Sequence, residues 1–452
     1  MLRQMRLMFG ISIFWLALSM LFDGINALVL PLQLSALGDQ ETRATVLGLL
    51  TFIGLLAGAL VQPVAGALSD RLQPLLSRKG FIGIGLLGCL TSLFLFAISQ
   101  SVAAVLIGYL AVQASASIAQ AGQQALIPDL VEERSRGAAS GLKGFMDISG
   151  AMLGFVVLGQ LLGSGQSMLA IGVIGATLVA AYILAVVLTP EDRPAANRVP
   201  KNANPLSQVF RLDLAQEKTD FTHLLLARFL FLLGIYATGR FLLFFVADRL
   251  GLEANQAAEQ AGTLLAGLAL ITVLASPVTG WLADRMGRVP LMVAGSILGA
   301  MSALMLIWAY SPVQILLFGG LMSLGSACFA GGSWALIADL VPKDESARYF
   351  GLANFSTAGA AAVAGLFGPV IDWVEFISPG NRFSVLFIVA AIAFFASVLP
   401  LRHILLKEVR DVQERNRGKD RTDASGLAVL SVPADSALAK KDQDPSGRTA
   451  PL

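Results

Sequence analysis

Charged side chains inside apolar runs are the residues of this sequence that could do chemistry. Five of them stand out, namely Asp23, Lys143, Asp147, Arg228 and Arg240. A charged group in hydrocarbon costs about 3 kcal/mol or more unless it finds a partner, so these positions are candidates for binding a solute or a proton.

Lys143 and Asp147 are four residues apart and share one face of a predicted helix. Asp147 lies about 15 Å from the end of its apolar run, near the middle of a membrane. As a structural pair the two charges would neutralise each other. As a working pair, one of them would exchange with solute or a proton.

Asp23 and Arg240 lie in equivalent apolar runs of the two halves of an internal repeat. An ion pair between them is geometrically feasible, and we hypothesise that Asp23 is a proton or substrate site whose state controls this pair. A static pair, or an arginine that extends toward the membrane surface, is the alternative. Arg228 lies about 9 Å from the nearer membrane face, within reach of lipid headgroups.

Uncharged polar and aromatic residues in the same runs are further candidates, although such residues also serve packing and bonding within helices. They are Asn26, Gln113, Gln120, Tyr236, Trp334 and Asn354. We assign Asn26, Tyr236 and Asn354 to the substrate and coupling site.

Twelve apolar runs position these residues. Most are 20 residues or longer, and about 20 residues in a helix cross the hydrocarbon of a bilayer. The sequence therefore predicts an all-α membrane protein with twelve transmembrane helices. The runs cover residues 8–32, 45–68, 80–99, 102–127, 138–162, 168–188, 222–247, 258–282, 289–309, 312–338, 348–371 and 383–400. The first run extends beyond signal-peptide length and is expected to be retained as a span.

The composition excludes a soluble protein, because 56% of the residues are hydrophobic and 14% are charged. Soluble domains carry roughly 45–50% and about 25%. The net charge of +2 gives no basic face for a nucleic-acid partner. Cys89 and Cys328 lie in apolar runs and cannot build a disulfide framework or a metal cage. We expect no metal, no cofactor and no enzyme activity, and a monomer in a lipid bilayer.

The short loops predict the orientation of the chain. With the N-terminus inside, sixteen Lys and Arg residues lie on the inner side, and three, Arg43, Arg249 and Arg382, lie on the outer side. Since positive loops stay in the cytoplasm, both termini are predicted to be cytoplasmic in a multi-pass protein of the plasma membrane.

An internal repeat divides the chain into two halves. "GALSDRLQPLLSRK" at 66–79 pairs with "GWLADRMGR" at 280–288, and "ALIPDLVEERSRGAASGLKGF" from residue 125 pairs with "ALIADLVPKDESARYFGLANF" from residue 335. One duplication with a four-residue insertion explains both matches. We predict a first six-helix half at 1–188, a cytoplasmic linker at 189–221, a second half at 222–400 and a largely disordered tail at 401–452.

The residue types in the repeated loop motif suit a position at the end of a helix bundle. Its glycines would let helix ends approach closely, its Asp would cap a neighbouring helix N-terminus, and its Arg would pair with an acidic residue. The predicted cytoplasmic gate comprises Gly66, Asp70, Arg71, Asp129, Gly280, Asp284, Arg285, Gly287, Arg288 and Asp339.

"GWLADRMGR" resembles the loop motif of the major facilitator superfamily, and a degenerate copy stands after the second run, as in that family. The first copy departs from the motif after Arg71. The resemblance covers roughly residues 7–400 and implies two six-helix halves that enclose a central site and rock around it. It implies a secondary transporter of a small solute by alternating access.

Weaker resemblances bear on the kind of transport. "QAGQQALIPDLV" is similar to part of the glycoside-pentoside-hexuronide and sucrose-type cation symporters, which favours symport of a sugar-like or other polar solute with a proton or sodium ion. Gly141, Gly150, Gly154 and Gly159 match part of a motif of drug/proton antiporters, which makes efflux of a drug or metabolite the alternative. Facilitated diffusion, and a non-transporting sensor or scramblase of the same fold, are more remote.

Overall fold

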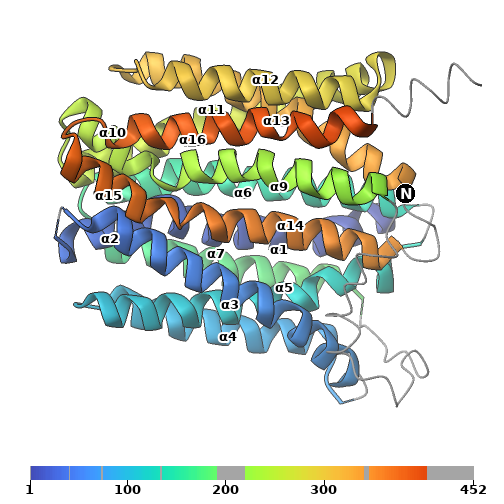
Figure 1. Cartoon of the computed structure of the whole chain (residues 1–452). Coiled ribbons are helices and arrows are strands. Elements are labelled where there is room, and N and C mark those ends of the chain that lie inside the picture. The colour runs from blue at the N-terminus through green and yellow to red at the C-terminus, as the bar shows by residue number, and fades with distance from the viewer. Residues whose placement is uncertain are drawn as a thin grey trace, which may run out of the picture. The chain divides into compact units, whose positions relative to one another are not determined.

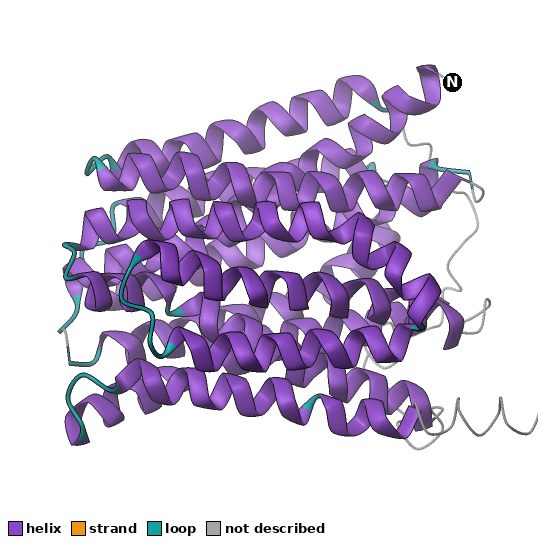
Figure 2. Cartoon of the chain, turned by 90° about the horizontal axis from the view of Figure 1, so that it is seen from above, coloured by secondary structure: helices purple, strands orange, loops and turns teal. Residues whose placement is uncertain are grey.

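Helices form all of the regular secondary structure in the part of the chain that the computed structural model describes, residues 2–39, 41–72, 75–132, 135–190, 219–340 and 346–404 (Figure 2). The first half contains α1 (Leu2–Gly24), the π-helix η1 (Ile25–Val29), α2 (Leu30–Leu37), α3 (Arg43–Leu72), α4 (Arg78–Ala97), α5 (Val102–Leu130), α6 (Arg136–Gly163) and α7 (Ser167–Leu188). The second half contains α9 (Thr219–Arg240), α10 (Leu242–Leu250), α11 (Ala254–Met286), α12 (Arg288–Leu306), α13 (Pro312–Leu340), α14 (Ser346–Ala364), α15 (Phe367–Ile377) and α16 (Arg382–Ala396).

Twelve helices within the described residues are long and apolar enough to cross a membrane, which confirms the expected number. A helix suits this solvent because it satisfies its backbone hydrogen bonds internally. α1, η1 and α2 together form the first span, Gln4–Leu37, and the eleventh, Leu352–Ile377, is interrupted between α14 and α15. Most of the predicted linker and tail lie outside the described residues. α9 begins three residues before the predicted start of its span.

The helices run side by side in an antiparallel bundle (Figure 1). In the first half α1 packs against α6 and α7, and α5 packs against α3 and α4. In the second half α13 packs against α11 and α12, and α9 packs against α14 and α16. The halves meet where α6 packs on α11 and where α3 packs on α14 and α15. These two contacts are equivalent to each other in the repeat, because each joins the second span of one half to the fifth span of the other.

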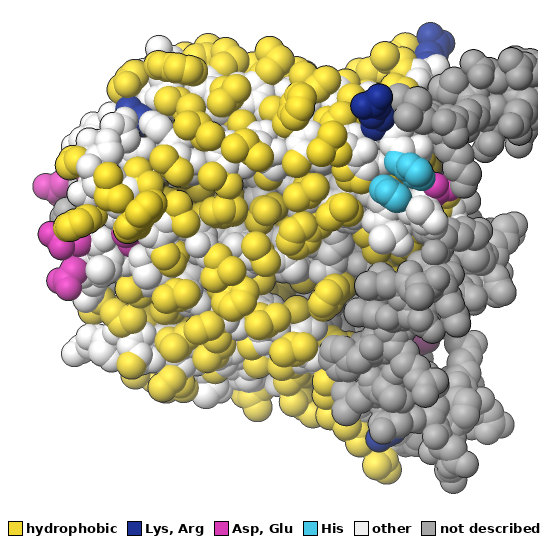
Figure 3. All heavy atoms as spheres, viewed as in Figure 1, with side chains coloured by type: hydrophobic (Ala, Val, Ile, Leu, Met, Phe, Trp, Pro, Cys, Tyr) yellow, Lys and Arg dark blue, Asp and Glu magenta, His cyan; other side chains and the backbone are white. Residues whose placement is uncertain are grey.

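The two ends of the bundle differ in the connections they hold. The end that holds the start of α1 and the α3–α4, α5–α6 and α11–α12 connections is called the proximal end. The distal end holds the α2–α3, α6–α7 and α10–α11 connections and lies on the left in Figure 1. Apolar side chains cover the visible flank between the two ends, and coloured charges lie toward the ends (Figure 3).

Candidate functional site

Asp23 lies in the middle of the first span, beside a change in its helical pattern. Ser19 Oγ donates a hydrogen bond of 2.9 Å to Asp23 Oδ2. The next turn is the π-helix Ile25–Val29. Pro31 accounts for this turn, because proline has no N–H for the carbonyl of Ala27 and its ring would clash with that oxygen in an α-helix.

Asn26 lies in the π-helix and links the first span to α5. Tyr109 donates its hydroxyl proton to Asn26 Oδ1 at 2.6 Å, and Gln113 Nε2 donates to the Tyr109 oxygen at 2.7 Å. Asn26 Nδ2 donates to the carbonyl of Phe22 at 2.7 Å. Asn26 is thus one turn from Asp23, and the hydrogen bond from Tyr109 joins this part of the first span to α5.

Asp147 on α6 faces the same serine as Asp23. Its carboxylate interacts with the Ser19 side chain, and the two carboxylates interact electrostatically. α6 can approach α1 here because residue 150 is a glycine, at which a Cβ would lie 2.1 Å from the carbonyl oxygen of Leu16. Two carboxylates from different helices therefore lie beside one serine side chain, which sequence reasoning missed.

Lys143 and Asp147 share one face of α6 but form no direct ion pair. Lys143 Nζ lies 3.7 Å from the centre of the Trp15 ring, in a cation–π contact with α1. The two charges still interact electrostatically, but no ion pair within 4.0 Å joins them. Helical spacing places both residues on one face, yet the aromatic ring on α1 offers the ammonium a nearer partner.

No ion pair within 4.0 Å joins Asp23 and Arg240 either. Arg240 ends α9 and is 7% exposed. Its guanidinium donates one hydrogen bond, from Nη2 to the carbonyl of Ala361 at 3.3 Å, and its Nε is buried without a partner. Arg240 interacts electrostatically with Asp23, Tyr109 and Tyr236. The two charges thus lie near each other without contact, because each is held by its own half.

Arg228 does not extend toward the headgroups, contrary to the sequence expectation. It is 6% exposed, and its guanidinium donates to Ser333 Oγ at 2.7 Å and to Thr357 Oγ1 at 3.3 and 3.4 Å. It also lies 4.2 Å from the centre of the Trp334 ring. Arg228 is therefore satisfied within the second half. Asn354 is exposed and has no hydrogen bond in the structure, so nothing joins it to the cluster.

The first copy of the loop motif forms an ion-pair cluster at the proximal end. Arg78 donates to Asp70 Oδ1 at 2.5 Å, to Asp129 Oδ2 at 3.1 Å and to Ser69 Oγ at 2.8 Å. Arg71, which was expected to provide the charge, is exposed and makes none of these contacts. The repeat contained the signal for Arg78, since the offset of 210 aligns it with Arg288.

The second copy is arranged differently. Gly287 has a φ of 90°, which favours glycine, and it joins α11 directly to α12. Arg288 donates to the carbonyl of Ala335 at 2.7 Å. Asp284 and Arg285 are exposed, and the guanidinium of Arg285 lies 4.1 Å from the Trp281 ring centre. The side chain of Asp339 lies outside the described residues, so its predicted pairing stays a prediction.

Gly66 and Gly280 do not bring helix ends together, so the expected close approach is wrong. A Cβ built at either position would meet nothing within 4 Å. The same holds for Gly137, Gly141 and Gly144 at the start of α6. The halves are thus not in tight contact around these proximal glycines.

Close contacts between the halves are found at the distal end. A Cβ at Gly48 on α3 would lie 2.0 Å from the carbonyl oxygen of Gly365, and one at Gly368 would lie 2.0 Å from that of Ala44. On the other side of the bundle, a Cβ at Gly262 on α11 would lie 2.4 Å from the carbonyl oxygen of Phe155 on α6. Glycines therefore allow both inter-half contacts to close.

A carboxylate of the second half caps a helix of the first half at this end. Asp372 Oδ2 accepts a hydrogen bond of 2.6 Å from the backbone N–H of Thr45, and the carboxylate also bonds the N–H of Ala44. These amides belong to the first turn of α3, where N–H groups lack helical partners and the helix dipole favours negative charge. Nearby, the Arg43 guanidinium lies 5.0 Å from the centre of the Phe244 ring.

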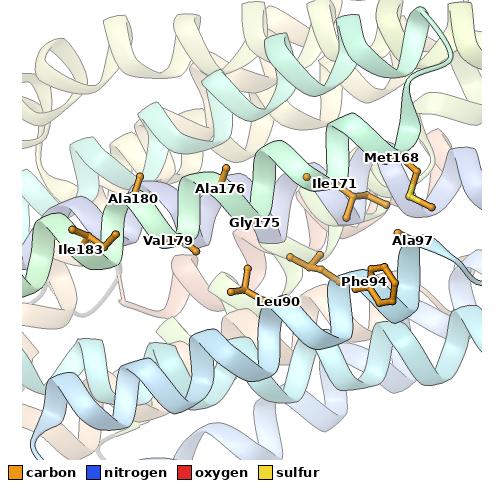
Figure 4. A pocket seen from close by; sticks show the side chains of 12 residues that line it. Leu90, Phe94, Ala97, Met168, Ile171, Gly175, Ala176, Val179, Ala180 and Ile183 are labelled. Atoms are coloured by element: carbon orange, nitrogen blue, oxygen red, sulfur yellow. The ribbon is translucent and has the colours of Figure 1, made fainter.

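Neither a groove on the flank of the bundle nor a group of metal ligands extends the charged site in the described residues. A groove of about 570 Å³ lies between α4 and α7 and is lined by apolar residues such as Leu90, Phe94 and Ile171 (Figure 4). Its chemistry matches lipid chains. Among the described residues, no three His, Cys, Asp or Glu side chains are grouped as metal ligands.

Comparisons with known proteins agree with this architecture. The family described as Major Facilitator Superfamily matches residues 7–258 and 224–439. Over 114 residues the chain is 38% identical to the Tetracycline resistance protein, class C, of Escherichia coli, covering 25% of this chain and 28% of that protein. Over 156 residues it is 33% identical to the Multi-drug resistance efflux pump PmrA of Streptococcus pneumoniae, covering 34% of this chain and 37% of that one. The matched segments thus span only about a third of each relative.

The fold also matches solved structures. A crystal structure of the peptide transporter POT in complex with alafosfalin superposes with a TM-score of 0.67 at 16% identity. The superposition covers 88% of this chain and 94% of that one. At this identity the likeness concerns the fold alone.

Proposed function

The chain belongs to the major facilitator superfamily, and on this premise we propose that it exports a small organic solute in exchange for protons. The family and the twelve spans make it an integral membrane transporter and not an enzyme. The substrate, the direction of transport and the coupling to protons are the parts that we propose.

The observation that carries the proposal is the pair of carboxylates around Ser19. Ser19 has a single hydroxyl proton, which it donates to Asp23, so its remaining capacity toward Asp147 is that of an acceptor. A protonated Asp147 can donate to that oxygen, whereas an ionised one would repel Asp23. In this proposal the pair of carboxylates holds one proton in the absence of solute.

Binding of a solute next to this pair explains why a proton is exchanged for the solute. Charges within a membrane protein are neutralised by a partner or by a proton. When solute contributes its own polar group to Asp23 or Asp147, the proton is no longer needed and leaves. When solute departs, a proton returns. Proton and solute thus alternate on one site, which is the requirement for antiport.

The inter-half contacts support alternating access around this site. They are tight at the distal end and open around the proximal glycines. The excess of Lys and Arg in the proximal loops supports our assignment of that end, with both termini, to the cytoplasm. We propose that this conformation faces the cytoplasm, in the plasma membrane, and that one chain suffices for transport.

Export is the direction favoured by the relatives, whose names describe tetracycline resistance and multidrug efflux. The antiporter-type glycines add support, because Gly150 and Gly159 are sites of close helix contact on α6. The few strings similar to cation symporters keep symport as the alternative prediction. One assay distinguishes the two.

Proteoliposomes that contain a pH-sensitive dye test this function. We expect tetracycline to move against an imposed proton gradient, with protons crossing in the opposite direction. Asp147→Asn should reduce coupled transport at least tenfold, and Arg71→Ala serves as the control because Arg71 is exposed and unpaired. Movement of solute and protons in the same direction, or a requirement for sodium, would contradict antiport.

A further inference from the structure

We infer that the transported solute carries both a cationic and an anionic group and bridges Asp23 on α1 to Arg240 on α9. This inference rests on the proposed function and names its class of solute. The starting point is the distribution of buried charge between the halves. Asp23 and Asp147 come from the first half, and Arg228 and Arg240 come from the second.

Arg240 is a buried cation with most of its hydrogen-bonding capacity unused. A guanidinium has five N–H donors, and Arg240 uses one of them, in a bond of 3.3 Å to a carbonyl. Its Nε is buried without a partner. Such an arrangement is unfavourable unless an anionic group binds, since a planar guanidinium suits a carboxylate or phosphate.

Arg228 shows what a satisfied arginine looks like in the same half. It donates to two hydroxyl groups and lies on the ring of Trp334. Both arginines are similarly buried, so burial alone does not distinguish them. The difference in partners marks Arg240 as the one available to an anionic group of a solute.

Asp23 is the corresponding group of opposite sign. Its one hydrogen bond comes from Ser19, and the residue is half-buried. The only lysine of the cluster, Lys143, is directed onto the Trp15 ring and not onto this carboxylate. A cationic group of a solute can therefore approach Asp23 without displacing an existing ion pair.

The relation between Asp23 and Arg240 sets the class of solute. The two side chains interact electrostatically but are not joined within 4.0 Å. The other charged or titratable groups around them are Asp147, Lys143, Tyr109 and Tyr236. A solute with a cation alone would leave Arg240 unpaired and add a like charge beside it, and a solute with an anion alone would do the same at Asp23. A solute with both charges satisfies each half and holds the two together.

A binding screen tests this inference without knowledge of the natural solute. Purified full-length protein in lipid nanodiscs is melted in the presence of several hundred small organic compounds, divided equally among cations, anions, zwitterions and neutral molecules. We expect stabilising compounds to be concentrated among the zwitterions. Blocking either charge of the best compound, as its amide or its N-acetyl derivative, should weaken binding at least tenfold.

Variants then locate the two charges. Asp23→Asn and Arg240→Gln should each weaken binding of the zwitterion at least tenfold, whereas Arg249→Gln, an arginine of the distal surface, should bind it as the parent does. Stabilisation by cations alone, by anions alone, by neutral compounds alone or by no compound overturns the inference. Zwitterion binding that is insensitive to Arg240→Gln overturns it as well.

The outcomes separate this inference from the proposed function. Zwitterions that bind and cross the membrane without counter-movement of protons would remove the antiport proposal and leave the solute class intact. Proton exchange with solutes of a single charge would leave antiport intact and remove the solute class.

Discussion

The proximal and distal ends of the bundle use similar residues for opposite purposes. At the distal end, Gly48, Gly365 and Gly368 lie against backbone of the other half, so that no Cβ fits. At the proximal end, Gly66 and Gly280 face open space. The charges differ too, since Asp372 caps a helix of the opposite half whereas Arg78 pairs within its own half. One end is thus closed between the halves, and the other is stabilised within each half.

The largest effect is expected from closing the space at the distal glycines. Gly365→Leu places a side chain where a Cβ alone would lie 2.3 Å from the carbonyl oxygen of Gly48. The distal end could then not close, and transport in proteoliposomes should fall at least tenfold. Each half should still fold, so the protein should remain monodisperse in detergent. Transport at the parental rate would show that this contact is not part of the cycle.

The next largest effect is expected from Arg78→Ala, which leaves Asp70 and Asp129 without their shared cation. Asp70 is half exposed, so solvent screens part of the loss, and we expect destabilisation of about 1–2 kcal/mol. The measurement is the melting temperature in detergent, compared with Arg71→Ala. Equal melting temperatures for the two variants would contradict the assignment of the charge to Arg78.

A smaller effect is expected from Asp372→Asn, which keeps the shape of the side chain and removes its charge. Loss of the charge at the N-terminus of α3 should cost about 1 kcal/mol, equivalent to a roughly fivefold shift toward opening of the distal end. The readout is the labelling rate of a cysteine introduced at Ala44, which is 2% exposed. An unchanged rate would mean that the cap does not contribute to closure.

The smallest effect is expected at the proximal glycines. Gly66→Ala and Gly280→Ala meet nothing within 4 Å, and alanine favours a helix over glycine by about 1 kcal/mol. Transport should therefore stay within about twofold of the parent, and stability should be equal or slightly higher by up to about 1 kcal/mol. A strong loss of transport in either variant would indicate that these glycines contact a partner in another conformation.

The sequence was sufficient for the architecture because each span needs about 20 apolar residues, a requirement that single runs display. It also located the charged residues that come together at Asp23, Asp147 and Arg240. It did not determine their contacts. Helical spacing relates Lys143 to Asp147 but contains no information about residues on other helices. In the structure the ammonium of Lys143 contacts the ring of Trp15 on α1.

Gates between the halves were the hardest part to predict. The loop motif suggested an Asp that caps a helix at the proximal end, whereas the cap in the structure is Asp372 at the distal end. The distal contacts depend on glycines in apolar runs, where a glycine that packs against backbone looks the same as one that faces open space. Only the three-dimensional arrangement distinguishes Gly48 from Gly66.

The π-helix of the first span has a consequence for the register of that span. Leu30 N–H bonds the carbonyl of Ile25, five residues back, so this turn holds one residue more than an α-turn. Deleting one residue from Ile25–Val29 would restore an α-turn and rotate everything before it by about 100° relative to the distal part of the span. Trp15, Ser19 and Asp23 would all turn away from α6 together. The single extra residue therefore sets the rotation of the first half of the span relative to the second. It lets Asp23 face the site while the distal part of the same span faces the closed end.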